Sequence, residues 1–587
     1  MAHALRSGLR NGGLRRGGLH AGLEGGSIFN IASLDLNFAK YKNIGSLVTF
    51  TRASSGTFVG SDGVLRTAVT NLSLRSEKLD EAGQWSVIGS GATLTATTDV
   101  AAPNGAMTAW TLTSSGAAAQ IQQAPTGISG ATYTGSFYIR RRSGTGTVNI
   151  RVSENINTPL VGVTSEWQRF SFTATSTSTT IRLGVNLSGI ADAVDLWGAQ
   201  LEQSTTVGEY IPTTSTINSA PRFDHNPTTG ESLGLLVEEA KTNSIRNNTG
   251  VGAVAGTPGT LPTNWSVASS VSGLSSQIIG TGTESGIAYI DIKWTGTPSA
   301  NGTIQHTFES NTNTAAVSGQ SWTSAVYQRL VGGVIPGTTS LLVVERSVAN
   351  SFLASSSTNV TVTDSALINQ RLAHSRTLNN ALTAYVNSRL DVSVVSGVAV
   401  DFTFRIGLPQ LELGAFATSV IPTTSATATA TRSADVASIT AANFSSWYNQ
   451  TEGTVFAASS IGSSSYAGGV LWDIGSAGAF GTSAYTNWNG SQWTLNPGSA
   501  PMNLSSIVTT SAFAANAAAL KGNDSVLAAN GLIGAVDSSC SMPASPTTLL
   551  IGKGGWSGAT NWFNGTIRRL TYWPTRLANS TLQSITQ

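Results

Sequence analysis

Short alternations of apolar and polar residues recur through most of the chain. In Phe137–Arg140, and again in Phe170–Thr173, aromatic or aliphatic residues alternate with small or polar ones. A period of two places one face of a strand on a core and the other in water. Turns rich in Gly, Asn and Ser separate these runs, as they do between strands. The pattern predicts a mainly β, multidomain protein of antiparallel sandwiches or jelly rolls in series.

One phrase occurs twice. Ala199–Ser215 reads AQLEQSTTVGEYIPTTS and Pro409–Ser425 reads PQLELGAFATSVIPTTS, and the two align without a gap. Proline cannot donate a hydrogen bond to a strand ladder, so Pro212 and Pro422 are expected to end one. We interpret the phrase as a closing strand with its exit from a domain.

The repeat extends upstream. Tyr133–Arg141 (YTGSFYIRR) matches Trp322–Leu330 (WTSAVYQRL), and the segment WQRFSFT matches NQRLAHS. We predict two copies of one jelly-roll sandwich, over residues 70–216 and 242–425. Ser365–Leu390 could also form a helix, but its match to strands of the first copy favours β structure.

The first copy is predicted to interrupt another unit of the chain. Residues 28–69 and 217–241 flank the first sandwich and do not match either repeat. We predict that they are two halves of one small β module. A domain can be inserted at a surface turn when its ends lie close together. Residues 426–587 form the last predicted unit, a tryptophan-rich sandwich.

Residues 1–27 stand apart because Gly-Leu recurs there and opposes a stable isolated helix. A disordered tail, a nucleic-acid contact and a peptide that orders on a partner are the three interpretations. Nucleic acid is disfavoured because arginines without lysines or aromatics make a thin footprint. We expect a docking peptide whose candidate contacts are Arg6, Arg10, Arg15 and Arg16.

Composition narrows the class. Charged residues make up 11% of the 587, but 40% are hydrophobic and the net charge is +2, which is not a disorder signature. The single Cys540 excludes an internal disulfide. No apolar run approaches the roughly 18 residues of a membrane span. The N-terminus lacks the apolar core of a secretory signal, so folding in a cytoplasm is expected.

The sequence offers little chemistry. Glycan cleavage usually needs two positioned carboxylates, and those of the last unit are far apart: Asp435, Glu452, Asp473, Asp524 and Asp537. We interpret Asp473 as a turn or strand-end residue. The five histidines show no metal-ligand spacing, although calcium held by carboxylates and carbonyls stays open. The prediction is no enzyme, no cofactor and no metal site.

The best binding candidates are tryptophans in polar turns. They are Trp488 and Trp493 in YTNWNGSQWT, and Trp556 and Trp562 in GKGGWSGATNWFNG. A sugar can pack its C–H face on an exposed indole while neighbouring amides bond its hydroxyls. The alternative is that these residues are core, as tryptophan usually is. We interpret four others as core: Trp85, Trp167, Trp197 and Trp265.

Three phrases resemble those of tailed-bacteriophage virion proteins, the tail fibre and head spike fibre family. They are TFTRASSGTFVGSDGVLRTA, APRFDHNPTTGESLGLLVEEAKTN and QLELGAFATSVIPTTSATATATRSAD. In that family the first two usually follow one another directly, whereas here a sandwich separates them. The sandwiches resemble carbohydrate-binding jelly-roll modules, and the last unit resembles concanavalin-like or laminin-G-like domains. None of the phrases carries catalytic residues.

The resemblance implies a non-enzymatic virion fibre or spike. Residues 1–27 would dock on another virion protein, which could be a tail protein, a portal or adaptor protein, or a capsid protein. The chain would form a homotrimer. It would fold in the host cytoplasm and contact host surface polysaccharide through its distal sandwiches. Two alternatives stay open: an architectural head decoration or stalk without a specific ligand, and a glycan depolymerase tailspike.

Overall fold

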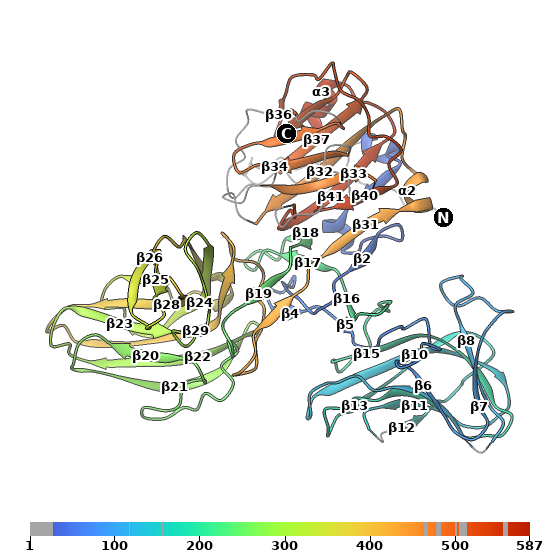
Figure 1. Cartoon of the computed structure of the whole chain (residues 1–587), viewed down its shortest axis with the longest axis horizontal. Coiled ribbons are helices and arrows are strands. Elements are labelled where there is room, and N and C mark those ends of the chain that lie inside the picture. Colours follow the sequence, from blue (N-terminus) through green and yellow to red (C-terminus); the bar gives the residue numbers. More distant parts are fainter. Residues whose placement is uncertain are drawn as a thin grey trace, which may run out of the picture. The chain divides into compact units, whose positions relative to one another are not determined.

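The protein is built almost entirely from antiparallel strands (Figure 1), which confirms the mainly β, multidomain prediction. The chain divides into two compact units, Met1–Asn37 with Ile439–Asn561 and Ile567–Gln587, and Phe38–Ser438 with Trp562–Thr566. The computed structural model describes residues 27–116, 118–154, 157–462, 468–476, 483–498, 502–503, 514–555 and 561–587. The candidate docking residues Arg6, Arg10, Arg15 and Arg16 lie outside the described residues.

The first repeat forms a two-sheet sandwich, here called sandwich 1. Its sheets have the strand orders β13-β10-β15-β8-β7 and β12-β11-β14-β9-β6. Ile121, Ile150 and Val185 are fully buried between them. The strands are β6 (Ser86–Ile88), β7 (Ala92–Ala96), β8 (Trp110–Ser114), β9 (Ala119–Gln123), β10 (Thr132–Ser143), β11 (Val148–Val152), β12 (Asn157–Pro159), β13 (Gln168–Thr175), β14 (Leu183–Leu187) and β15 (Ala193–Glu202).

The second repeat forms sandwich 2 with the same plan (Figure 1): β27-β24-β29-β22-β21 and β26-β25-β28-β23-β20. Ser365–Leu390 contributes strands and one short 3-10 turn, so the β interpretation is confirmed. The elements are β20 (Ser266–Ser269), β21 (Leu274–Glu284), β22 (Ile287–Gly296), β23 (Gly302–Thr307), β24 (Ser321–Val334), β25 (Thr339–Arg346), β26 (Phe352–Val360), η3 (Leu367–Asn369), β27 (Arg371–Thr377), β28 (Tyr385–Val394) and β29 (Val400–Leu413).

The repeated phrase has one structural role, performed twice. Gln200, at the end of β15, accepts a hydrogen bond from the Ile211 amide at 2.8 Å, and Asn71 donates to the Ile211 carbonyl at 2.8 Å. In sandwich 2, Gln410 accepts from the Ile421 amide at 2.8 Å, and Asn243 donates to the Ile421 carbonyl at 3.1 Å. Buried backbone groups need partners. The phrase therefore ties the exit segment to the closing strand.

The segments on either side of sandwich 1 contact each other. Asn71 pairs with Asn218 in a short antiparallel ladder, and the Val59 amide donates to Asp224 at 2.7 Å. The elements of this region are α1 (Phe38–Tyr41), β2 (Thr49–Thr51), β3 (Thr57–Val59), β4 (Leu65–Thr67), β5 (Thr70–Asn71), β16 (Asn218–Ser219), β17 (Arg222–His225), β18 (Ser232–Val237), β19 (Lys241–Asn243), β30 (Ala430–Arg432) and the start of β31 (Val436–Thr440).

A buried charge cluster lies in this region, made of Arg52, Arg222, Glu238, Arg432 and Asp435. Asp435 bridges Arg52 and Arg222 at 2.7 and 2.5 Å, and Glu238 bridges Arg222 and Arg432 at 2.8 and 3.0 Å. Burial by itself would raise the pKa of Glu238, but the two guanidiniums hold that pKa at about 2. All five residues come from the three phrases that resemble virion fibres, so those phrases build the interior of one module.

The C-terminal unit also contains two antiparallel sheets. One has the order β41-β32-β37-β38-β39 with β1 on β41, and the other β40-β33-β34-β35-β36. The elements are η2 (Ser27–Ile31), β1 (Leu34–Leu36), α2 (Ala441–Ser445), β32 (Glu452–Ile461), β33 (Gly469–Gly475), β34 (Ala484–Trp488), β35 (Trp493–Asn496), β36 (Met502–Asn503), β37 (Ala514–Lys521), β38 (Val526–Ala529), β39 (Leu532–Ile533), β40 (Thr548–Ile551), β41 (Gly565–Trp573) and α3 (Asn579–Ile585).

Candidate functional site

The polar turns around the predicted tryptophans leave their indoles in the interior. Trp488 and Trp493 are a directly opposed pair across β34 and β35, and are 2% and 1% exposed. Only the connecting turn is exposed, where Asn489 accepts from the amides of Ser491 and Gln492. An indole this buried presents no face to a ligand in solvent. The two indoles therefore form no exposed binding surface. Glycan contact by these residues stays a prediction.

Of the other two candidates, the structure describes one. Trp562 is 9% exposed, and Trp556 lies outside the described residues. The core interpretation holds for three other tryptophans, which are buried: Trp85, Trp197 and Trp265. Trp167 is partly exposed and packs beside the cluster around Trp197, with its indole donating to the Ala101 carbonyl at 2.9 Å.

Asp473 was expected at a turn or strand end, but it lies within β33 and is buried. Burial raises the pKa of Asp473 to about 6, and its carboxylate accepts the Gly555 amide at 2.9 Å. Among the described residues, no group of three or more His, Cys, Asp or Glu side chains could hold a metal ion. No helix in the described part of the chain is long and apolar enough to cross a membrane.

The candidate ligand-binding surface is the outer face of one sheet of sandwich 1. Residues of β9, β14 and β11 alternate, so that Ile121, Val185 and Ile150 enter the core while their neighbours face outward. The outward side chains are amides and guanidiniums, and Gln122, which is 8% exposed, is the most covered of the glutamines on this face. We call this surface the amide–arginine face; it consists of Gln120, Gln122, Asn149, Arg151, Asn157, Arg182 and Asn186.

The strand register aligns this face into rows. One row crosses all five strands through Ser86, Gln122, Gly184, Arg151 and Asn157. At its centre, a Cβ on Gly184 would lie 2.5 Å from the carbonyl oxygen of Ile121, so the backbone there accepts only glycine. No side chain therefore stands between Gln122 and Arg151, and the guanidinium reaches across to the glutamine oxygen at 3.0 Å.

The same glutamine connects the face to a cavity. Gln122 also accepts from the side-chain amide of Gln120, its neighbour along β9. The cavity has a volume of about 490 Å³, within the range of small-ligand sites. It is lined by Leu72, Leu74, Gly83, Gln84, Ser86, Gln122, Gln123, Ala124, Pro125, Thr126 and Ile217.

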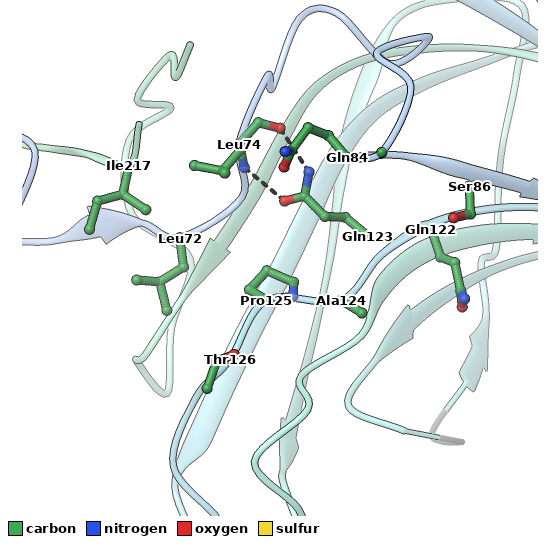
Figure 2. A pocket seen from close by; sticks show the side chains of 11 residues that line it. Leu72, Leu74, Gln84, Ser86, Gln122, Gln123, Ala124, Pro125, Thr126 and Ile217 are labelled. Carbon is green, nitrogen blue, oxygen red and sulfur yellow. Dashed lines mark hydrogen bonds between the residues drawn. The ribbon is translucent and has the colours of Figure 1, made fainter. Parts of the chain in front are cut away.

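Figure 2 shows how the wall of this cavity is held. The carboxamide of Gln123 forms two hydrogen bonds with the backbone of Leu74, accepting at 2.7 Å and donating at 3.0 Å. This mimics a pair of strand bonds and fixes the segment above the sheet. Ser86 and Gln122 lie at the end of the cavity opposite Leu72 in this view. The cavity thus combines an apolar end with a polar end that includes Gln122 of the amide–arginine face.

The face is electropositive. Burial lowers the pKa of Arg151, and the nearby charge of Arg182 lowers it further, against a smaller opposing effect of Glu154. Two guanidiniums in proximity repel each other. The carboxylate of Glu154 is itself bonded by the Thr177 hydroxyl at 3.0 Å. Amides can both donate and accept, and guanidiniums donate in a fork, so this surface is suited to binding a polar or anionic ligand.

Sandwich 2 carries the same row with different residues. When Ile304 of β23 is matched to Ile121 of β9, the row reads Ala268, Gln305, Asp391, Ser340 and Asn359. Asp391 thus replaces Gly184, and Ser340 replaces Arg151. The counterpart of Arg182 is Arg389, which forms an ion pair with Asp391 at 2.7 Å. Sandwich 2 therefore pairs this arginine with an acid at the position where sandwich 1 has Gly184.

A second hollow in sandwich 1, of about 390 Å³, lies beside the partly exposed Trp110. Its lining includes Glu77, whose pKa burial raises, and the exposed Met107. The Trp110 indole donates to the Glu77 carbonyl at 3.0 Å, which fixes the ring. An aromatic ring beside a carboxylate is a further arrangement that could contact a sugar.

Sequence reasoning did not single out Gln122, Arg151 or Arg182. A signal was present, because the strands read AQIQQ, VNIRV and LGVNL, in which polar residues or glycine alternate with apolar ones. Only the register shows that these side chains form one face.

No protein-family model and no curated protein matches the chain. Among solved structures, it is similar to the tandem CBM22 modules of Paenibacillus barcinonensis Xyn10C, at 12% identity and a TM-score of 0.20, covering 59% of this chain and 98% of that one. It is also similar to the CBM40 of a Ruminococcus gnavus sialidase bound to α2,3-sialyllactose, at 15% identity and a TM-score of 0.21, covering 24% and 83%. A Trypanosoma rangeli sialidase matches at 10% identity and a TM-score of 0.21, covering 90% and 92%. TM-scores near 0.2 carry no argument about function, so the chemistry has to be derived from the residues of this chain.

Proposed function

We propose that the chain is a non-enzymatic glycan-binding protein of a tailed-phage virion, a fibre or spike that contacts host polysaccharide through sandwich 1. The observation that supports the binding role is the amide–arginine face, which adjoins a cavity of about 490 Å³ at Gln122. Sugar hydroxyls both donate and accept hydrogen bonds, and carboxamides match them in both roles. Side chains mounted on strands hold such a pattern more rigidly than side chains on loops do.

The virion role is supported by the three resembling phrases. They meet in the buried charge cluster, where Arg52, Glu238 and Asp435 come from three separate parts of the chain. Such a set of buried ions is demanding in geometry. Its residues therefore favour a module shared with the fibre family over a chance match of short sequences.

The non-enzymatic role is supported by the contacts of the carboxylates that the sequence singled out. Asp435 lies in the buried charge cluster, Glu452 pairs with Lys521 at 3.1 Å, and Asp524 pairs with Arg576 at 2.9 Å. These contacts favour structural roles for these three carboxylates.

A glycan array probed with the full chain tests the binding role. We expect binding that Gln122→Ala weakens and that the matched Gln305→Ala in sandwich 2 leaves unchanged. If both variants bind as tightly as the parent chain, the proposed site is wrong. A folded chain that binds no glycan would favour the architectural alternative, and release of reducing ends from host polysaccharide would favour a depolymerase.

Particle assembly tests the virion role. We expect a chain without residues 1–27 to fold but to be missing from assembled particles. Its incorporation at the normal level would contradict docking through that segment.

A further inference from the structure

We propose that the sugar held by sandwich 1 carries a carboxylate, and that Arg151 and Arg182 bind this carboxylate above Gly184. The inference rests on the proposed glycan-binding function and specifies the class of ligand. It follows from the geometry of the row, from the charge balance of the face, and from the contrast with sandwich 2.

The two arginines can reach one anion. Arg151 is opposite Gly184 in the β11–β14 register, and Arg182 precedes Gly184 by two residues. Diagonal neighbours on one face of an antiparallel pair are about 7–8 Å apart, within reach of long side chains. Because Gly184 has no side chain, the Arg151 guanidinium crosses the space above it to the Gln122 oxygen at 3.0 Å, and a ligand carboxylate there would replace Gln122 as the acceptor.

The charge balance of this part of the face is positive. The charge of Arg182 lowers the pKa of Arg151, and the opposite charge of Glu154 raises it by less. A carboxylate placed between two guanidiniums relieves their repulsion and accepts charge-assisted hydrogen bonds, which are about twice as strong as neutral ones. The amides of Gln120 and Gln122 are then placed to bond the hydroxyls of the same sugar.

Sandwich 2 shows where such an anion belongs. At the position of Gly184 it has Asp391, whose two carboxylate oxygens bind the Nε and Nη2 of Arg389 at 2.7 Å. Arg389 corresponds to Arg182 in the other copy. The fold therefore supplies a carboxylate at this position in sandwich 2 and omits it in sandwich 1. A ligand carboxylate above Gly184 would restore the same ion pair.

Calorimetric titration of the full chain with matched sugars is the test. The probes are oligogalacturonate and sialyllactose, each with its methyl ester, which keeps the sugar and removes the charge. We expect at least one acid to bind about tenfold or more tightly than its ester, with an affinity that falls as salt rises. A sulfated galactan oligomer serves as the third arm.

Variants locate the site. Arg151→Ser installs the residue of sandwich 2 and is expected to weaken acid binding about tenfold or more, while Arg151→Lys keeps part of it. The control is Arg389→Gln in sandwich 2, which should bind like the parent. Thermal unfolding of each variant checks that the fold is retained.

The outcomes separate this inference from the proposed function. Equal binding of acid and ester, or an Arg151→Ser variant that binds like the parent, overturns the carboxylate site while glycan binding stands. Preference for the sulfated oligomer over both acids overturns the choice of carboxylate. A chain that binds none of the acids, esters or sulfated sugars, and no glycan on the array, overturns the proposed function and this inference together.

Discussion

Sandwich 1 and sandwich 2 share a strand order and a closing phrase, yet the same sheet face differs between them. The buried positions agree in character, as Ile121 and Ile304 do, because both cores need apolar side chains. On the outer face, Gly184 and Arg151 correspond to Asp391 and Ser340. The duplicated fold depends on its interior, so the solvent face is free to acquire different chemistry.

The exits of the two sandwiches differ as well. The position of Glu209, which is exposed in sandwich 1, is occupied in sandwich 2 by Ser419. The Ser419 hydroxyl donates to Glu238 at 2.6 Å and accepts from Arg222 at 2.6 Å. The exit of sandwich 2 is thus bonded into the buried charge cluster, whereas that of sandwich 1 is held by its strand contacts.

The largest expected effect is the loss of an acid from this cluster. Glu238→Ala leaves Arg222 and Arg432 buried with one carboxylate fewer, and should lower the free energy of unfolding by about 3–5 kcal/mol. Urea denaturation measures it. The control Glu209→Ala, on the exposed counterpart exit, should change stability by less than about 0.5 kcal/mol. Similar effects of the two substitutions would erase the distinction between the exits.

The second effect is a loss of stability toward low pH that His306 should contribute to sandwich 2. His306 is fully buried, which lowers its pKa to about 4, and its Nε2 accepts from the Trp294 indole at 3.0 Å. The unfolded chain takes up a proton below about pH 6.5, so the unfolded state binds more protons in this window. Stability is full above pH 6.5 and should fall by roughly 3 kcal/mol as the pH drops to about 4.

Hydrogen exchange between pH 7 and pH 4 measures this loss in each sandwich. The counterpart of His306 in sandwich 1 is Gln123, which does not titrate. His306→Gln should therefore reduce the pH dependence of sandwich 2, leaving the smaller contribution of His374, whose pKa burial also lowers. The loss from Glu238 belongs to a lower window, because its depressed pKa removes stability only as the pH falls from about 4.5 to about 2. A profile unchanged by His306→Gln would refute the assignment.

The third effect should be equal in the two copies. Gln200→Ala and Gln410→Ala each leave a buried isoleucine amide without its acceptor, at a cost of about 1–3 kcal/mol. Faster exchange of the Ile211 amide in one variant and of the Ile421 amide in the other would show it. A clear inequality would mean that the repeated phrase does not serve the same purpose twice.

The smallest effect concerns the neutralised face. Asp391→Asn removes the charge that pairs with Arg389 and should alter stability by less than about 1 kcal/mol, because the pair is only partly buried. Sandwich 2 should then gain weak, salt-sensitive affinity for a uronate oligomer, by a few-fold. Calorimetry in the Arg151→Ser background isolates that gain, and its absence would show that Ser340 also matters.

Sequence patterns anticipated the fold better than the site. Alternation and the repeated phrase predicted strands that the structure contains, including β27 and β28 in a stretch that could have been helical. The tryptophan prediction relied on the polarity of neighbouring residues. Trp488 and Trp493 show the weakness of that signal, since the polar residues form the turn while both indoles enter the core.

The sequence by itself determined the strands, the duplication and the interior positions, because period-two alternation and buried hydrogen bonds act over short stretches of chain. Only the tertiary structure decided which surface could bind a ligand. Gln122, Gly184 and Arg151 belong to three strands that are not consecutive in the chain, and their alignment depends on the pairing register. The comparison of charge between the two copies also depends on register, since Arg389 and Asp391 correspond to Arg182 and Gly184 only once the strands of the two sandwiches are matched.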